Sequence, residues 1–243
     1  MRKISSFSIC SLFLCMLGLA SPAQKLNNGD NGKPKIEGSG HVVTKDIPVQ
    51  SFDQLEASGV FNIVLMQGGK EAVKIEAEDN LQDLFEVKNE ADKLIVEMKK
   101  DSHFNNKKKM TVYITFSNLK GMNLKIVGNL TSEGNLSFGD LSLENKSVGS
   151  VELALSAQKL DISNKGVGNL QLSGKADNAV IRSNSVGAIK AGGLIVQTLD
   201  IDNDGVGSAE VNVAREIKFK DSFLGKVRNV SNTNPKTIKK AVI

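Results

Sequence analysis

The chain has 243 residues, and its 31 Lys and Arg residues nearly balance its 27 Asp and Glu residues, for a formal net charge of +4. This balance excludes the nucleic-acid-binding proteins that depend on a concentrated positive face. The chain has no Trp and a single Tyr, so its core has to be built largely from aliphatic side chains.

Residues 1–23 have the features of a secretory signal peptide. Arg2 and Lys3 provide a positive start, residues 4–19 are apolar or small, and small residues lead to a cleavage point after Ala23 or three residues earlier. We therefore expect an exported protein. Its mature part would have 29 basic and 27 acidic residues, a net charge of +2.

Both cysteines of the chain, Cys10 and Cys15, lie inside this signal. The mature protein is therefore expected to have neither disulfides nor thiolate chemistry. No later segment has the run of about 20 apolar residues that a membrane-spanning helix needs, so we predict no transmembrane segment in the mature chain.

The next part of the chain reads as a leader followed by β-strands. Residues 24–40 are rich in Asn, Gly and Lys and are expected to form a flexible leader. Residues 41–127 contain short runs of alternating apolar and polar residues, such as 61–65 and 112–116, and predict an N-terminal region of less regular strands. A single helical turn is predicted at residues 79–85.

Residues 128–243 are dominated by a repeat. A branched apolar residue followed by Gly recurs six times, and successive glycines are 21, 19, 19, 20 and 18 residues apart. A near-constant period of this length is typical of stacked coils, whereas the hairpin turns of a β-sandwich, the alternative, rarely keep one dipeptide at such spacing. We predict an all-β chain with a β-solenoid of coils of about 19 residues, continuous with the preceding region. The six pairs are Val127-Gly128, Val148-Gly149, Val167-Gly168, Val186-Gly187, Val206-Gly207 and Leu224-Gly225.

The alternation within one coil predicts which side chains are buried. Leu160 and Ile162 should point inward, and Asp161 and Ser163 should point to solvent. The Gly of each pair should turn a corner with positive φ. The Val before it is expected to turn inward and join the aliphatic core.

An Asn recurs just before the corner of four coils, at positions 145, 164, 184 and 203. Stacked Asn side chains can hydrogen-bond along the axis of the coils. Asn184 is one residue closer to its Val-Gly pair than the others, so the ladder is expected to be imperfect there.

Residues 52–68, FDQLEASGVFNIVLMQG, resemble the signature of the head-GIN-domain family. Gly59, Val60 and Asn62 correspond to its Gly-Ile-Asn element, with Phe61 interposed. The resemblance continues at residues 73–77 and 94–96 and extends over roughly residues 41–230.

Members of this family are envelope proteins of Bacteroidetes-type bacteria that are described as auto-transporter adhesins. The resemblance implies a β-helix-like fold, export, and a surface or binding role. It supplies no catalytic residues.

Asp200, Asp202 and Asp204 stand at alternate positions before Gly205 and are the candidate calcium ligands of the sequence. An EF-hand would need a bidentate acid at the twelfth position, where Val211 stands. The alternative is that Asp200 and Asp202 line the solvent face of a strand and that Asp204 begins a turn. We favour this alternative and therefore predict no metal site and no cofactor.

The remaining polar candidates carry no recognisable chemistry. His41 and His103 have no partner at metal-ligand spacing. The run of lysines at residues 107–109 would suit an acidic polysaccharide or a lipid head group, or it is a solvated hairpin loop. We predict no catalytic residue.

These observations favour a non-enzymatic exported cell-envelope protein, an adhesin or a binding or structural module, in the periplasm, at the outer membrane or on the cell surface. Its partner would be an envelope or surface component, a glycan or a protein. One alternative is a carbohydrate-active β-helix enzyme, a lyase or glycosidase, but residues 139–218 contain no aromatic residue to form a sugar platform. Another is a periplasmic signalling or stress component.

Overall fold

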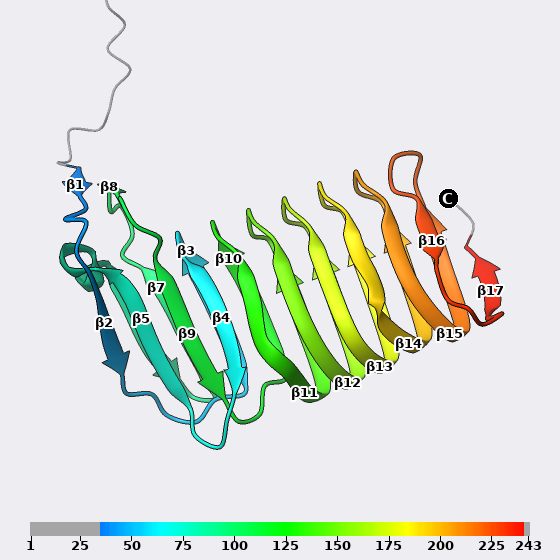
Figure 1. Ribbon diagram of the computed structural model, residues 1–243, viewed down its shortest axis with the longest axis horizontal. Coiled ribbons are helices and arrows are strands. Elements are labelled where there is room, and N and C mark those ends of the chain that lie inside the picture. The colour runs from blue at the N-terminus through cyan, green and yellow to red at the C-terminus, as the bar shows by residue number, and fades with distance from the viewer. Residues whose placement is uncertain (1–34, 241–243) are drawn as a thin grey trace, which may run out of the picture. The chain divides into compact units, whose positions relative to one another are not determined.

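Parallel β-strands, stacked coil upon coil, make up most of the computed structural model, which describes residues 35–240. Fifteen strands belong to one continuous sheet that winds around an aliphatic core, and two further short strands pair separately. Figure 1 shows the coils side by side. The expected signal peptide and residues 24–34 of the expected leader lie outside the described residues.

The C-terminal coils are built from five long strands, and two short strands follow them. In four of the five long strands, alternating burial is interrupted by two successive outward residues at a bend. In β12, for example, the inward residues alternate over 151–157 and again over 160–164, and Gln158 and Lys159 between them are both exposed. The strands are β11 (Leu130–Asn145), β12 (Val151–Asn164), β13 (Leu170–Ser183), β14 (Ile189–Asn203), β15 (Ala209–Asp221), β16 (Val227–Asn229) and β17 (Lys236–Lys239).

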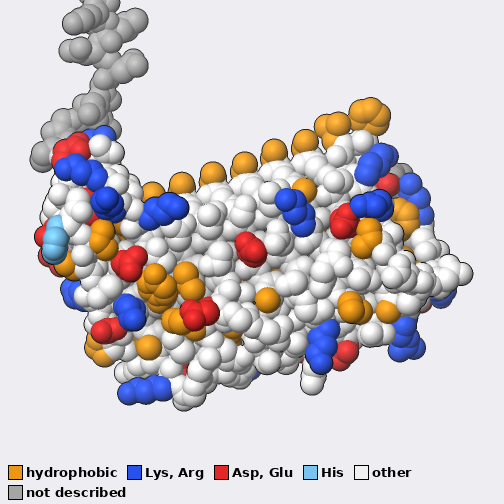
Figure 2. Space-filling view, viewed as in Figure 1, with side chains coloured by type: hydrophobic (Ala, Val, Ile, Leu, Met, Phe, Trp, Pro, Cys, Tyr) orange, Lys and Arg blue, Asp and Glu red, His pale blue; other side chains and the backbone are white. Residues whose placement is uncertain are grey.

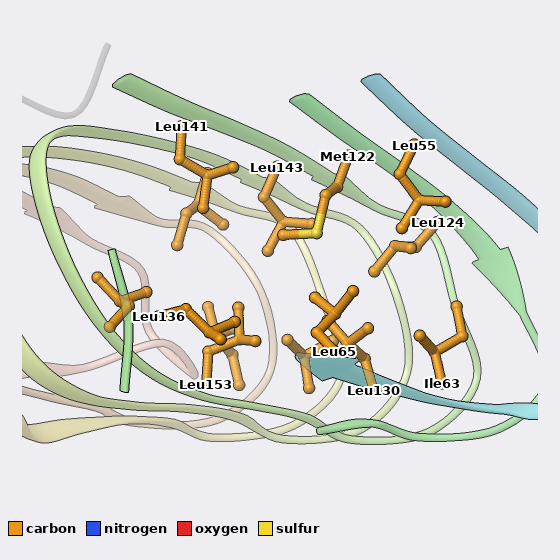
Figure 3. Close-up of a cluster of buried hydrophobic side chains, with 14 of the residues drawn as sticks. Leu55, Ile63, Leu65, Met122, Leu124, Leu130, Leu136, Leu141, Leu143 and Leu153 are labelled. Carbon is orange, nitrogen blue, oxygen red and sulfur yellow. The ribbon is translucent and has the colours of Figure 1, made fainter. Parts of the chain in front are cut away.

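Each coil therefore has two walls that enclose the core. We call the outward surface of the first half of a coil, residues 151–157 in β12, the first face, and that of the second half, residues 160–164, the second face. Figure 3 shows side chains from the two walls pointing toward each other. One wall contributes Leu55, Met122, Leu124, Leu141 and Leu143, and the other contributes Ile63, Leu65, Leu130, Leu136 and Leu153.

Neighbouring coils pair in parallel with matched register. Ile162 pairs with Leu143 on one side and Ile181 on the other, and Ile181 pairs with Ile201. Equivalent apolar residues thus form columns along the stack, and burying each such side chain contributes roughly 1.5–3 kcal/mol. Ile162 is buried and Asp161 is exposed, as predicted. The architecture confirms the predicted all-β solenoid, with about six turns of roughly 20 residues.

The corners between coils depend on glycine. Gly149, Gly168 and Gly187 have φ values of 142°, 133° and 144°, a region that residues with a Cβ rarely adopt. A Cβ on Gly168 would lie 2.2 Å from the carbonyl oxygen of Gly149 in the preceding coil. The predicted positive φ is therefore confirmed, and the close stacking of the corners gives a second reason for glycine.

The valines of the corners point outward, so the prediction that they turn inward is wrong. They are about half exposed: 52% for Val148, 50% for Val167 and 54% for Val186. The inward place in the corner is taken by the preceding residue, which is buried Ser147, Gly166 or Ser185 in successive coils. The place is narrow: serine occupies it at positions 147 and 185, and at position 166 a Cβ would lie 2.4 Å from the carbonyl oxygen of Ser147.

A buried polar column runs beside the corners, and it differs from the predicted Asn ladder at one coil. The side-chain amide of Asn145 donates to Asn164 Oδ1 at 2.8 Å, and that of Asn164 donates to Ser185 Oγ at 3.0 Å. Asn184 is exposed, and Ser183 occupies the column in its place. The column is therefore irregular at this coil, as the shifted spacing of Asn184 predicted. The hydroxyls of Ser183 and Ser185 stand where an Asn side chain would otherwise lie.

The N-terminal region extends both walls of the solenoid and closes its end. β10 pairs with β3 and β3 with β7 on one wall, and β11 pairs with β4 and β4 with β9 on the other, all in parallel. Antiparallel strands then follow at the edge, with β6 on β7 and β5 on β9. The bounds are β2 (Val42–Ile47), β3 (Gln54–Gly59), β4 (Asn62–Gln67), β5 (Ala72–Glu78), β6 (Phe85–Glu90), β7 (Lys93–Met98), β9 (Thr111–Phe116) and β10 (Gly121–Ile126).

Two local features complete this end. The predicted helical turn is a 3-10 helix, η1 (Asp79–Leu84), whose Leu81 and Leu84 are buried against the end of the core. The last residues of the expected leader are paired, because β1 (Ile36–Glu37) lies parallel to β8 (Phe104–Asn105). Among residues 35–240 no helix has the length and apolar character to cross a membrane.

Candidate binding surface

The second face carries acidic and basic side chains that pair from one strand to the next. Near the N-terminal end, Glu56 on β3 lies 3.3 Å from Lys93 Nζ and 3.9 Å from Lys125 Nζ. Near the C-terminal end, Glu216 on β15 lies 3.2 Å from Lys236 Nζ. Each exposed pair contributes at most about 1 kcal/mol to stability. The main effect of these ion pairs is instead to order the polar face, because the charged side chains hold one another in place.

The most connected group on this face joins β13, β14 and the end of β17. Arg182 contacts Asp200 at 2.9 Å and Asp202 at 3.3 Å, and Lys240 contacts Asp202 at 2.8 Å and also bonds Asp200. Partial burial alone would raise the pKa of Asp200, but hydrogen bonds from Lys240 and Arg182 outweigh this and hold that pKa below its ordinary value. For Lys240, the same two aspartates outweigh the effect of burial and raise the pKa.

This network accounts for the three aspartates that the sequence offered as calcium ligands. Asp200 and Asp202 lie on β14 and share two cationic partners, whereas Asp204 follows the strand and bonds Lys220 at 3.2 Å. The geometry matches the alternative interpretation of a strand face and a turn. Within the described part of the chain, no three His, Cys, Asp or Glu side chains are grouped so as to hold a metal ion.

A shallow polar hollow of about 240 Å³ lies on the second face where β3, β7, β10 and β11 meet. Glu56, Lys93, Asn123 and Glu144 line it. Asn123 Oδ1 is buried and has no hydrogen-bond partner in the protein. Because buried polar atoms normally have partners, this oxygen is an unsatisfied acceptor in the wall of the hollow.

A row of apolar side chains projects from the corner edge of the solenoid (Figure 2). The corner valines belong to this row because Val127, Val148, Val167, Val186 and Val206 are bridged to one another in parallel. We call these five valines, with Leu224 at their C-terminal end, the valine ridge. It is the apolar counterpart of the polar second face.

A buried carboxylate, Glu78 at the end of β5, ties the N-terminal end together. It accepts backbone N–H groups from Gly40 at 2.5 Å, Lys107 at 2.9 Å and Lys108 at 3.3 Å. Burial alone would raise the pKa of Glu78, but these hydrogen bonds outweigh it and lower that pKa. The loop that carries the lysine run is therefore fixed through its backbone.

The two histidines take part in local contacts at the N-terminal end of the solenoid. His41 is largely exposed, and its Nδ1 lies 3.5 Å from Asp79. The carbonyl oxygen of His103 accepts the N–H of Ile36 in the β1–β8 pair. The structure does not bring the two into a shared site.

Sequence reasoning missed three of these features: the valine ridge, the unpaired oxygen of Asn123, and buried Glu78. The ridge had a signal, since alternation counted from Ile162 through the corner places position 167 outward. Glu78 and Asn123 had none, because their environments depend on residues distant in the sequence, such as Gly40 and Lys107 for Glu78.

Comparison with known proteins agrees with the sequence resemblance. The family model described as "Putative auto-transporter adhesin, head GIN domain" matches residues 51–233. Among curated proteins there is no match.

Solved structures share the fold. A "putative adhesin" from Bacteroides fragilis NCTC 9343 has 30% sequence identity and a TM-score of 0.72, over 84% of this chain and 97% of that chain. A "putative adhesin" from Parabacteroides merdae ATCC 43184 has 21% identity and a TM-score of 0.56, over 84% and 96%. A "Putative lipid binding protein" from Parabacteroides distasonis ATCC 8503 has 14% identity and a TM-score of 0.60, over 85% and 97%.

The family model covers most of the chain, and the Bacteroides fragilis protein aligns along nearly its whole length. The last two structures, at lower identity, show the common fold. The chain belongs to the head-GIN-domain family.

Proposed function

We propose that the protein is exported and acts as a non-enzymatic, adhesin-like binding module of the cell envelope. Family membership and the likeness to structures named as adhesins support this role. The observation that carries it is the ordered polar second face with its hollow, where Asn123 Oδ1 is buried without a partner. A face already held by pairing between strands loses little side-chain freedom on binding.

The hollow favours a hydroxyl-bearing partner, such as a glycan. Glu56 and Glu144 offer acceptors, Lys93 offers donors, and Asn123 Oδ1 offers an unused acceptor, all within one lining. Protein–carbohydrate contacts consist largely of such hydrogen bonds, each worth about 0.5–1.5 kcal/mol net.

Binding to a panel of immobilised neutral and acidic polysaccharides tests this proposal. Asn123→Leu keeps the approximate size of the side chain and removes the unused acceptor. We expect it to weaken binding by about tenfold, as the loss of one well-placed hydrogen bond would. Ser163→Ala, a smaller change elsewhere on the second face, serves as the control and should bind as the wild type does. Absence of binding to the whole panel, or equal binding by both variants, would count against the hollow as the site.

Location is tested separately by cell fractionation and protease treatment of intact cells. We expect the protein in the envelope fraction, with its N-terminus at Gln24 or Ser21. Protein in the cytoplasmic fraction that retains Met1 would contradict export. Protein that is found in the envelope fraction but is protected from protease in intact cells would favour the periplasmic signalling or stress component over the adhesin.

One observation bears on the enzymatic alternative. A polysaccharide lyase needs acidic and basic residues together on successive coils, and Arg182, Asp200, Asp202 and Lys240 do lie together. However, the raised pKa of Lys240 keeps this amine protonated, so it is a poor general base. We therefore expect no turnover of the same polysaccharides, and cleavage that is lost in Asp200→Asn would establish the enzyme instead.

A further inference from the structure

The valine ridge is an exposed apolar row of unusual regularity. Its five valines are between 49% and 54% exposed, Leu224 is 58% exposed, and neighbouring Phe223 is 90% exposed. Figure 2 shows a single file of apolar side chains along one edge of the molecule. Scattered exposed apolar residues need no explanation, but a contiguous row commonly marks an interaction site.

The backbone of the central ridge valines is hydrogen-bonded through both its N–H and its carbonyl groups. Val148, Val167 and Val186 each donate their N–H to the preceding coil and accept the N–H of a corner glycine through their carbonyl oxygen, at 2.8 to 3.2 Å. Gly207 N–H likewise donates to Leu224 O at 3.1 Å. A surface that enters a lipid interface has to satisfy its backbone groups internally, and these three valines meet this requirement.

A column of lysines accompanies the N-terminal half of the ridge. Lys125, Lys146 and Lys165 each stand two residues before a ridge valine and are exposed. Like charges on adjacent strands repel, and two acids offset this. Glu144 contacts Lys146 at 2.5 Å, and Lys165 and Lys125 also lower its pKa, while Glu56 lies 3.9 Å from Lys125. In residues 35–240 no carboxylate forms an ion pair with Lys165, so the column keeps a positive excess.

We propose that the valine ridge docks on an anionic lipid surface. The valines, Leu224 and Phe223 would enter the boundary between head groups and acyl chains, and the three lysines would meet the head-group phosphates. Lysine suits this position because its apolar stem lies along the apolar surface while the ammonium group reaches the polar layer. Apolar burial combined with basic side chains is the usual basis of binding to anionic interfaces.

A second copy of the chain fits the ridge less well. Two convex rows, each one side chain wide, would meet along a line and bury less than the roughly 1,200 Å² of a stable interface. A lipid surface deforms around a convex ridge and needs no matching groove.

The inference goes beyond the proposed adhesin-like role and does not depend on it. The hollow lies on the second face and the ridge on the corner edge, so their tests use different residues and different ligands. A failure in one assay therefore leaves the other interpretable.

Co-sedimentation of the purified protein with phosphatidylcholine vesicles, with or without phosphatidylglycerol, tests the proposal. We expect binding to the anionic vesicles. Replacing Val148, Val167 and Val186 together by Ser should lower the partition coefficient at least about tenfold, because it removes apolar burial at the interface. Replacing the three column lysines by Gln should lower it roughly fivefold per lysine, on anionic vesicles only. Free phosphate at millimolar concentration should not compete.

Ile195→Ser is the matched control, because Ile195 is 49% exposed on β14 but lies outside the ridge. It should bind as the wild type does, and unchanged melting temperatures would show that the ridge variants fold. The proposal is overturned if the wild type ignores anionic vesicles, or if the ridge variant binds as well as Ile195→Ser. It is also overturned if the wild type is a dimer by ultracentrifugation and the ridge variant a monomer, since the ridge would then serve a second copy.

Discussion

At the scale of single residues, the corner glycines are the least replaceable positions of the stack. Gly168 combines a φ of 133° with an approach that would place a Cβ 2.2 Å from Gly149 O. We predict that Gly168→Ala lowers the free energy of unfolding by about 1–3 kcal/mol, measured by urea denaturation. Gly139→Ala is the control, because a Cβ there meets nothing within 4 Å. Equal losses in the two variants would contradict this account of the corner.

The buried carboxylate of Glu78 makes stability depend on pH. Its pKa is lowered in the folded protein, so the unfolded chain binds the proton more readily and stability falls as pH falls. The contribution is present above the ordinary carboxyl pKa of 4.5 and is lost as the pH drops through the lower folded value.

We therefore predict that Glu78→Gln removes part of the acid sensitivity of the wild type. The measurement is the urea midpoint at neutral pH and at about pH 3, where carboxyl groups titrate. Glu133→Gln, at an exposed position, should keep the wild-type dependence. If the Glu78→Gln variant is as acid-sensitive as the wild type, the Glu78 carboxylate does not contribute to the pH dependence of stability.

At the scale of the coil, the polar column specifies how corners stack. Asn164→Ala would leave the side-chain amide of Asn145 without its acceptor at 2.8 Å. An unsatisfied buried polar group costs about 1–3 kcal/mol, so we predict a loss of that size in chemical denaturation. Asn184→Ala, at the exposed neighbouring position, should cost less than about 0.5 kcal/mol. The reverse order would place Asn184 in the column after all.

The coil also shows what the sequence could and could not predict. The period near nineteen predicted the columns because in-register parallel strands bring equivalent residues together, as with Ile162 and Ile181. The valines were misplaced because their apolar character was given more weight than the alternation, which continues from Ile162 through Asn164 and Gly166 and leaves Val167 outside. The burial of Asn123 Oδ1 and of Glu78 was not predictable, since it depends on which distant strands meet.

At the scale of the whole described unit, each coil rests on its neighbours, and the apolar corner edge contrasts with the polar second face. The aliphatic columns run through the stack and carry its stability, as in other solenoids whose energy is the sum of coils and interfaces. The valine ridge runs along the outside of the same stack, and its exposed side chains are not part of the buried core. Stability and the proposed lipid contact thus depend on different residues of the same repeat.

The most direct test of this account compares Ile162→Ala with Val167→Ala, five residues apart in one coil. Ile162 is fully buried and Val167 is half exposed. Equilibrium denaturation should show a loss of roughly 2–5 kcal/mol for Ile162→Ala, because it leaves a cavity in the column, and less than about 1 kcal/mol for Val167→Ala. Equal losses in the two variants, or a larger loss for Val167→Ala, would contradict a stack that buries its columns and displays its corners.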